Sequence, residues 1–271
     1  MTNVVIGAAS GMGAAIARKL APRGPLIVAD FNLEGARKIA AEIGGDVRPM
    51  ACDISSQEQV EALLAEVDNL EALIITAGLS GSQATGRRIL EVNLAGHARV
   101  LNAAERLLRP GTVGITVASQ SGYMVPPVPE LMAVLDDPLA PNLVDKLAEL
   151  FDVNVAAMAY QCSKRGAHRI PPRLARTWGE KGARILSLSP GINDTPMNRS
   201  DEAKNPIMLE MVKACPLGRR GTPEDIANVV AFLTSTGAAY MTGSDVLVDG
   251  GMVTILPKNV WDGQLRLPAQ A

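Results

Sequence analysis

Short apolar segments alternate with amphipathic stretches along the first part of this chain. Each apolar segment is long enough for one strand, and each intervening stretch has the apolar spacing of one helix. In order, these segments are NVVI, residues 11–21, LIVAD, residues 33–43, VRPMACD, residues 56–67 and EALIITAG. A helical stretch at 87–108 and three later strands, VGITVAS, ARILSLSP and DVLVDGG, extend the pattern. The sequence therefore predicts an α/β fold with a doubly wound parallel sheet of about seven strands.

One segment interrupts this alternation. Residues 123–155 carry five prolines and two short helical patterns between a strand and the next helix. We interpret the segment as a helical cap inserted into a single domain at residues 1–257. Residues 258–271 follow the last strand without a clear period, and we expect them to form a tail or a pocket cover.

Charge and cysteine content argue against several classes of function. A net charge of −2 disfavours nucleic acid as a partner, and no apolar run is long enough to span a membrane. The start MTNVVIGAAS lacks the features of a signal peptide, which predicts a cytoplasmic protein.

Cys52, Cys162 and Cys215 lack metal-ligand spacing, so we expect buried free thiols and no metal. His97 and His168 are interpreted as structural or surface residues.

A glycine-rich turn lies between the first strand and the first helix, in the stretch Gly7-Ala8-Ala9-Ser10-Gly11-Met12-Gly13. Backbone amides at a helix N-terminus and the helix dipole both favour an anion. The turn therefore predicts a site for the pyrophosphate of a dinucleotide, and a tight turn without a ligand is the alternative.

Asp30 ends the second strand, 17 residues after Gly13. A carboxylate there can accept hydrogen bonds from the ribose hydroxyls of adenosine and would repel a 2′-phosphate. Neither the residues of the turn nor Phe31 supplies a cation that would neutralise such a phosphate. The sequence therefore favours NAD over NADP as the cofactor, while a helix cap is the other interpretation of Asp30.

Tyr160 and Lys164 stand four positions apart in AYQCSKRGAH. On a helix this spacing puts a phenol and an ammonium on one face. Bringing the pKa of a phenol from about 10 to about 7 takes roughly 4 kcal/mol of preferential phenolate stabilisation, and a fixed ammonium supplies part of it. Oxidised nicotinamide is also cationic, which links this pair to hydride transfer more naturally than to hydrolysis. An exposed helical pair without a catalytic role is the alternative.

These features together resemble the short-chain dehydrogenase/reductase family, and the resemblance covers about residues 3–251. Asp53-Ile54 resembles the family's adenine-contacting acidic-aliphatic pair, and Thr76-Ala77-Gly78 stands where the family usually has Asn-Ala-Gly. The segment SPGINDTPM resembles the family segment that borders nicotinamide, and VLVDGG resembles its last strand.

The resemblance implies a Rossmann-type domain that forms a homo-oligomer, either dimer or tetramer. It also implies a catalytic tetrad. Tyr160 is the expected general acid/base, Lys164 lowers its pKa and binds the nicotinamide ribose, Ser119 holds the substrate oxygen, and Asn93 anchors a proton-relay water. Ser121 is the alternative to Ser119 for holding the substrate oxygen.

The resemblance also implies a set of cofactor-binding residues. The expected residues are Gly7, Ser10, Gly11, Met12, Gly13, Asp30, Phe31, Asp53, Ile54, Ala77, Gly78, Tyr160, Lys164, Pro190, Gly191, Ile192 and Thr195.

The chain also departs from the family pattern. Ile6, Ile75 and Thr76 replace a threonine and paired asparagines, so the central strands must be braced differently. The long separation of Ser119 and Tyr160 resembles the subgroup that contains 3α-hydroxysteroid dehydrogenase/carbonyl reductase. Two prolines at 171–172 lie where the family's helix normally continues, and they predict a kink near residues 168–170.

The sequence therefore predicts NAD-dependent interconversion of a hydrophobic secondary alcohol, steroid-like or alicyclic, and its ketone. A 3-oxoacyl or other carbonyl reductase is one alternative, and a catalytically idle nucleotide-binding regulatory protein is another. We expect the cap to cover a bulky substrate, or else to be part of the core. Its apolar residues are Met124, Val125, Leu131, Met132, Leu135, Leu143, Leu147, Leu150 and Phe151.

Overall fold

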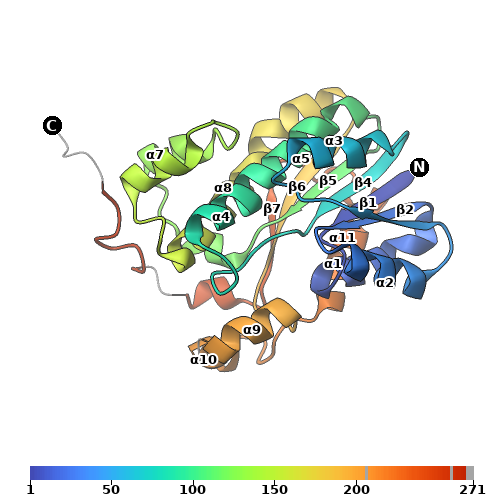
Figure 1. Ribbon diagram of the computed structural model, residues 1–271. Coiled ribbons are helices and arrows are strands. Elements are labelled where there is room, and N and C mark those ends of the chain that lie inside the picture. Colours follow the sequence, from blue (N-terminus) through green and yellow to red (C-terminus); the bar gives the residue numbers. More distant parts are fainter. Residues whose placement is uncertain (205–206, 257–258, 267–271) are drawn as a thin grey trace.

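Parallel strands build one sheet in the order β3-β2-β1-β4-β5-β6-β7 (Figure 1). This computed structural model describes residues 1–204, 207–256 and 259–266. The strands are β1 (Thr2–Ile6), β2 (Leu26–Asp30), β3 (Val47–Ala51), β4 (Leu70–Ile75), β5 (Val113–Val117), β6 (Arg184–Pro190) and β7 (Asp245–Val248). The strand order reverses between β1 and β4, and in such sheets ligands bind at the carboxyl ends of the strands beside this point. The predicted seven-stranded parallel sheet is confirmed.

Helices cover both faces of the sheet, as Figure 1 shows. They are α1 (Gly11–Leu20), α2 (Leu33–Ile43), α3 (Gln57–Ala65), α4 (Gly86–Leu90), α5 (His97–Ala103), α6 (Pro129–Leu135), α7 (Leu143–Leu150), α8 (Ala156–Glu180), α9 (Pro196–Lys204), α10 (Ile207–Ala214) and α11 (Pro223–Leu233). The strands alternate between two cores because successive side chains point to opposite faces. In β1, Val4 and Ile6 pack on the side of α3, α5 and α8, whereas Val5 packs on the side of α1, α2 and α11.

The helical stretch predicted at 87–108 is present but is not one regular helix. It consists of α4, a π-helical turn at Glu91–Gly96, α5 and a short 3₁₀ segment at Ala104–Leu107. Asn93 lies in the π turn. Such turns are rare and are frequent at functional sites.

The inserted segment contains the two short helices predicted for it, α6 and α7. Ion pairs attach both helices to the rest of the domain. Arg169 on α8 bonds to Asp136 just after α6 at 2.6 Å, and Arg87 on α4 bonds to Asp145 on α7 at 2.9 Å. The cap therefore lies against α4 and α8 (Figure 1).

Helix α8 runs without interruption from Ala156 to Glu180 and includes Pro171 and Pro172. The prolines therefore do not end the helix, although neither can donate an amide hydrogen bond to the preceding turn. The kink expected near residues 168–170 stays a prediction.

Part of the predicted tail packs against the cap. Trp261 is buried, its ring lies 5.4 Å from that of Phe151, and its Nε1 donates to Oε1 of Gln161 at 2.8 Å. The backbone amide of Arg266 donates to the carbonyl of Leu150 at 2.7 Å. The predicted boundary at 257–258 and residues 267–271 lie outside the described residues.

Cys52, Cys162 and Cys215 are buried free thiols, as expected. Among the helices of the described residues, none has both the length and the apolar character needed to cross a bilayer.

Candidate active site

The glycine turn packs so tightly that two of its glycines have no room for a side chain. Gly7 has a φ of +91°, and a Cβ there would lie 2.4 Å from the amide nitrogen of Ala77. A Cβ on Gly13 would lie 2.1 Å from the carbonyl oxygen of Gly7. Thr76 braces the turn, since its Oγ1 lies 3.0 Å from the carbonyl oxygens of Ile6 and Gly7. This contact links β1 and β4 without the residues that the family usually has here.

The first turn of α1 has the features of an anion site. It contains no acidic residue, and the Ser10 side chain makes no capping hydrogen bond to it. Within the described chain, the amides of Gly11, Met12 and Gly13 contact no acceptor. Unpaired amides at the positive end of a helix fit the pyrophosphate of a dinucleotide.

Asp30 lies beside this turn, at the carboxyl end of β2. Its Oδ2 accepts from the Ala9 amide at 2.9 Å, and its Oδ1 accepts from the Asn32 amide at 2.8 Å. Each oxygen keeps a lone pair, so the carboxylate can also accept from ribose hydroxyls. Phe31 follows and is 80% exposed.

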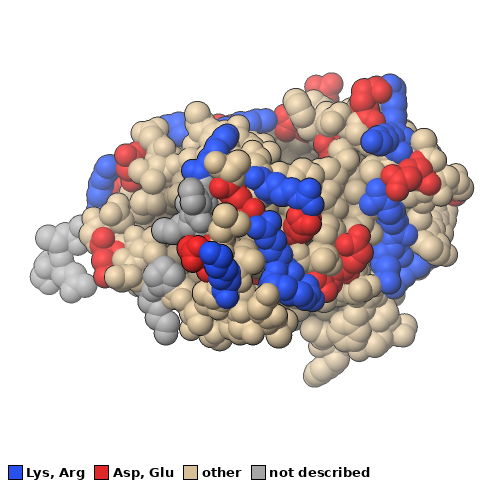
Figure 2. All heavy atoms as spheres, turned by 90° about the horizontal axis from the view of Figure 1, so that it is seen from below, with Lys and Arg blue, Asp and Glu red and all other residues tan. Residues whose placement is uncertain are grey.

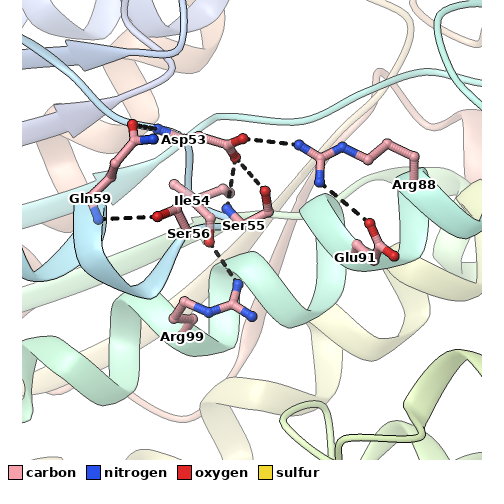
Figure 3. Close-up of polar contacts among 8 residues, drawn as sticks. All are labelled: Asp53, Ile54, Ser55, Ser56, Gln59, Arg88, Glu91 and Arg99. Atoms are coloured by element: carbon pink, nitrogen blue, oxygen red, sulfur yellow. Dashed lines mark hydrogen bonds and ion pairs between the residues drawn. The ribbon is translucent and has the colours of Figure 1, made fainter.

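Asp53 and Ile54 lie after β3, on the same edge of the sheet. Asp53 accepts hydrogen bonds from Ser55 and forms an ion pair with Arg88 on α4 (Figure 3). The burial of Asp53 would raise the pKa of its carboxyl. The Ser55 hydrogen bonds and the Arg88 charge outweigh that effect and lower the pKa.

Ala77 and Gly78 follow β4; Gly78 lies beside Asn93 of the π turn, and the carbonyl of Ala77 lies 2.7 Å from Nε2 of His97. Both ends of the buried Asn93 amide bond to the backbone of Leu79 at 2.8 Å. A Cβ on Gly78 would lie 3.3 Å from Oδ1 of Asn93 and 3.7 Å from Nζ of Lys164. Asn93 thus holds the loop after β4 beside the lysine.

Tyr160, Lys164 and Ser119 come together at the ends of α8 and β5. The Lys164 ammonium lies 5.7 Å from the centre of the Tyr160 ring and donates to the carbonyl of Val117 at 3.0 Å. Ser121 donates through its Oγ to Oγ of Ser119 at 2.9 Å. The rival serines are therefore hydrogen-bonded to each other, and Ser119 is the one whose hydroxyl affects Tyr160.

Burial changes the pKa values of the titratable residues in this group. Burial raises the pKa of the Tyr160 phenol, the Ser119 side chain opposes that shift, and the Asp201 carboxylate adds to it. Burial lowers the pKa of Lys164 to about 8. An ammonium with that pKa remains mostly protonated at neutral pH, so it can stabilise a phenolate beside it.

The segment after β6 lies against the glycine turn. A Cβ on Gly11 would lie 3.4 Å from Cγ2 of the buried Thr195, which places Thr195 at the start of α1. Pro190 ends β6, Gly191 packs closely on the backbone of Asp249, and Ile192 is buried next.

Helix α9 closes one side of the site. Asp201 accepts from Oγ of Ser80 at 2.8 Å, and Lys204 donates to the carbonyl of Ser82 at 3.0 Å. Figure 2 views the molecule from the side of α9 and α10 and shows basic and acidic residues interspersed on this face.

Both histidines are buried, which confirms the interpretation as structural residues and rules out the surface alternative, but sequence reasoning did not place them beside the tetrad. His97 is fully buried, with its ring nitrogens near Oγ1 of Thr116 and the carbonyl of Ala77. His168 Nε2 lies 3.0 Å from the carbonyl of Ser119. His97 follows Asn93 by four residues and His168 follows Lys164 by four, so helical spacing could have placed both beside the tetrad.

The substrate-facing interpretation of the cap is wrong for most of its apolar residues. Most of these side chains lie in the main hydrophobic core because α6 and α7 must bury their apolar faces against α4 and α8. Leu150 packs against that core, and Met124 belongs to a separate apolar cluster around Ile192. The core residues are Val125, Leu131, Met132, Leu135, Leu143, Leu147 and Phe151.

Comparison with known proteins identifies the family. Residues 2–131 match the family described as short chain dehydrogenase, and residues 149–253 match the one described as enoyl-(acyl carrier protein) reductase. The chain is 33% identical to D-threitol dehydrogenase of Mycolicibacterium smegmatis, covering 92% of this chain and 91% of that protein. It is 28% identical to 3beta-hydroxysteroid dehydrogenase 1 of Eggerthella lenta, covering 94% of each.

Among solved structures, the 3-alpha-hydroxysteroid dehydrogenase of Pseudomonas sp. B-0831, complexed with NADH, has the same fold. The TM-score is 0.75 at 24% identity, covering 94% of this chain and 98% of that one. With a relative above 30% identity along nearly its whole length, this chain belongs to the short-chain dehydrogenase/reductase family.

Proposed function

We propose that this protein is an NAD-dependent dehydrogenase that interconverts a hydrophobic secondary alcohol and its ketone. One observation carries the proposal: Tyr160 and Lys164 on α8 stand together beside Ser119 at the end of β5. A phenol, an ammonium and a hydroxyl in this arrangement can move one proton to or from a substrate oxygen.

In the oxidation direction, the Tyr160 phenolate takes the proton of the substrate hydroxyl. The Ser119 hydroxyl donates a hydrogen bond to the same oxygen, and the Lys164 ammonium stabilises the phenolate before transfer. When bound, NAD supplies the acceptor for the hydride that leaves the carbinol carbon. In the reverse direction, Tyr160 returns its proton to the carbonyl oxygen. We keep Asn93 as the anchor of a relay water within this proposal.

Asp30 supports NAD rather than NADP. Its carboxylate is anchored by the amides of Ala9 and Asn32, so it cannot swing away from a 2′-phosphate without breaking both hydrogen bonds. The charge repulsion would then oppose NADP binding.

A methionine-rich cluster supports a hydrophobic substrate. It surrounds Ile192, which directly follows the Pro190-Gly191 pair, and offers apolar surface on that side of the site. An alicyclic or steroid-like alcohol is the substrate class that we favour, since one relative is named as a hydroxysteroid dehydrogenase. The cluster consists of Ile192, Cys215, Met252 and Leu256, with Met124, Met208, Met211, Val212 and Val253 packed against them.

A 3-oxoacyl reductase remains the second candidate, because the chain is 28% identical, over 93% of its length, to a protein of Escherichia coli named as a 3-oxoacyl-(acyl-carrier-protein) reductase. We also propose a homo-oligomer, a dimer or tetramer, which light scattering of the purified protein would measure. A cytoplasmic location stays a prediction.

A panel of substrates with both cofactors tests the proposal. The purified protein is assayed with alicyclic alcohols, hydroxysteroids, D-threitol and a 3-oxoacyl thioester, and the reduced cofactor is followed by absorbance. We expect the highest kcat/KM for an alicyclic or steroid alcohol with NAD. Preference for the thioester with NADPH would favour the second candidate, and turnover of none of these compounds would contradict both.

A further inference from the structure

The segment after β3 is held from both sides. Gln59 on α3 accepts from the backbone amide of Asp53 at 2.9 Å, and Arg99 on α5 donates to the carbonyl of Ile54 at 2.8 Å (Figure 3). Arg88 on α4 reaches the Asp53 side chain from the side away from Gln59 (Figure 3). The segment is therefore fixed to helices on either side of it, at the carboxyl edge of the sheet where ligands of such folds bind.

The Asp53 carboxylate has little free capacity left. An ionised carboxylate offers about four acceptor positions. Both on Oδ1 are filled by Ser55, through its amide at 2.8 Å and its hydroxyl at 2.7 Å. Arg88 fills one position on Oδ2 at 3.0 Å. The remaining position is on the same oxygen that Arg88 holds, and the Asp53 side chain is 20% exposed.

One backbone donor accompanies this acceptor. Within the described residues, the amide of Ile54 donates to no protein group, although the carbonyl of the same residue is bonded to Arg99. An amide donor next to an anionic acceptor matches the edge of adenine, where the ring nitrogen N1 accepts and the 6-amino group donates. Hypoxanthine has the opposite pattern at these two atoms, because its N1 carries a proton and its 6-oxygen only accepts.

We propose that Arg88 is a positioning residue for adenine recognition by Asp53. Its ion pair fixes Oδ2 and turns the last acceptor position on that oxygen towards the 6-amino group, and it does not itself touch the base. This assignment rests on the proposed function, because it requires the dinucleotide to place its adenine beside Asp53.

Arg87 provides a matched control for Arg88. The two arginines are adjacent on α4 and are similarly exposed, with 50% and 40% of their side chains accessible. Arg87 pairs with Asp145 on the cap, whereas Arg88 pairs with Asp53. Arg87→Met therefore removes the same charge from the same helix without altering the Asp53 contact.

The experiment measures equilibrium binding of NADH and of reduced nicotinamide hypoxanthine dinucleotide by calorimetry. The wild type should prefer NADH. In Arg88→Met the affinity for NADH should fall about five- to twentyfold, as expected when a hydrogen bond to a charged group is weakened. The affinity for the hypoxanthine dinucleotide should change much less, so the preference for adenine shrinks. Arg87→Met should keep the wild-type preference, and thermal melting shows whether each variant is folded.

A second variant tests whether Arg88 acts through Asp53. Asp53→Ala, which removes the acceptor altogether, should lose the same preference, and adding Arg88→Met to it should cause no further loss. Equal weakening of both dinucleotides in Arg88→Met, or an unchanged preference, would overturn the role of Arg88 while leaving the proposed function intact. A folded wild type that binds neither dinucleotide would overturn the proposed function and this assignment with it.

Discussion

The Lys164 ammonium donates a hydrogen bond across 3.0 Å to the carbonyl of Val117, two residues before Ser119. The helix that carries the tyrosine and the strand that leads to the serine are thus joined by the lysine itself. This contact also requires the ammonium to be buried, with only 5% of Lys164 exposed.

Burial of Lys164 should make stability depend on alkaline pH. Its pKa is lowered from 10.5 to about 8 in the folded protein, so between these values the unfolded chain holds a proton that the folded protein has lost. The free energy of unfolding should therefore rise with pH across this window, by up to about 3 kcal/mol. Urea denaturation of the wild type and Lys164→Met across the window measures the difference, and parallel stability curves would contradict it.

His97 should have an analogous effect at acid pH. Burial is the main cause, and the Lys164 charge a lesser one, of a pKa lowered from 6.5 to about 3. Between these values the unfolded chain binds a proton that the folded protein excludes, so stability is lost as pH falls from 6.5 to 3. The loss should reach about 5 kcal/mol. In urea denaturation, His97→Gln should lose less stability than the wild type between pH 6.5 and 3. An equally large loss in the variant would show that His97 is not the cause.

Tyr160→Phe should leave folding and NADH affinity unchanged and reduce turnover about a hundred- to ten-thousandfold, because only the proton-transferring hydroxyl is removed. Steady-state kinetics with the best substrate of the panel measures this, and NADH calorimetry is the control. Near-normal turnover would overturn the role of the tyrosine.

Gly13→Ala should destabilise the protein and abolish dinucleotide binding. Its methyl group would lie 2.1 Å from the carbonyl of Gly7 and would force the turn apart. The overpacking should cost about 1–3 kcal/mol. Gly179→Ala in α8 is the control, since a Cβ there has nothing within 4 Å and alanine favours a helix. Thermal melting and NADH titration compare the two variants. Equal melting temperatures and equal NADH affinities would refute the steric clash at Gly13.

Asp30→Asn should change the choice of cofactor. The amide removes the negative charge that opposes a 2′-phosphate while keeping one oxygen acceptor. The ratio of NADPH to NADH affinity should rise at least about tenfold. Calorimetric titration of the wild type and the variant with both cofactors measures this ratio, and an unchanged ratio would show that Asp30 does not set the preference.

The fold could be predicted because each strand and helix carries its own local signal. The apolar strands of four to seven residues, the helical spacing between them and the glycine turn all act over short distances along the chain. Tyr160 and Lys164 were identifiable for the same reason, since their relation depends only on one helix.

Contacts between distant segments could not be predicted in this way. The pairing of Arg88 with Asp53 joins residues 35 positions apart, and that of Asp201 with Ser80 joins residues 121 apart. Neither has a periodic pattern in the sequence. The apolar spacing of α6 and α7 likewise shows that these helices bury a face, but it does not reveal whether a substrate or the protein core covers it.

The burial of the cap's apolar side chains in the core has a practical consequence for redesign. Changes there would alter thermal tolerance before they altered which alcohols the enzyme accepts. Mutant libraries intended to broaden or redirect its substrate range should instead vary the loop at residues 79–83 and helix α9. These two segments are joined by the Ser80–Asp201 and Lys204–Ser82 hydrogen bonds, and the Asp201 carboxylate acts on Tyr160.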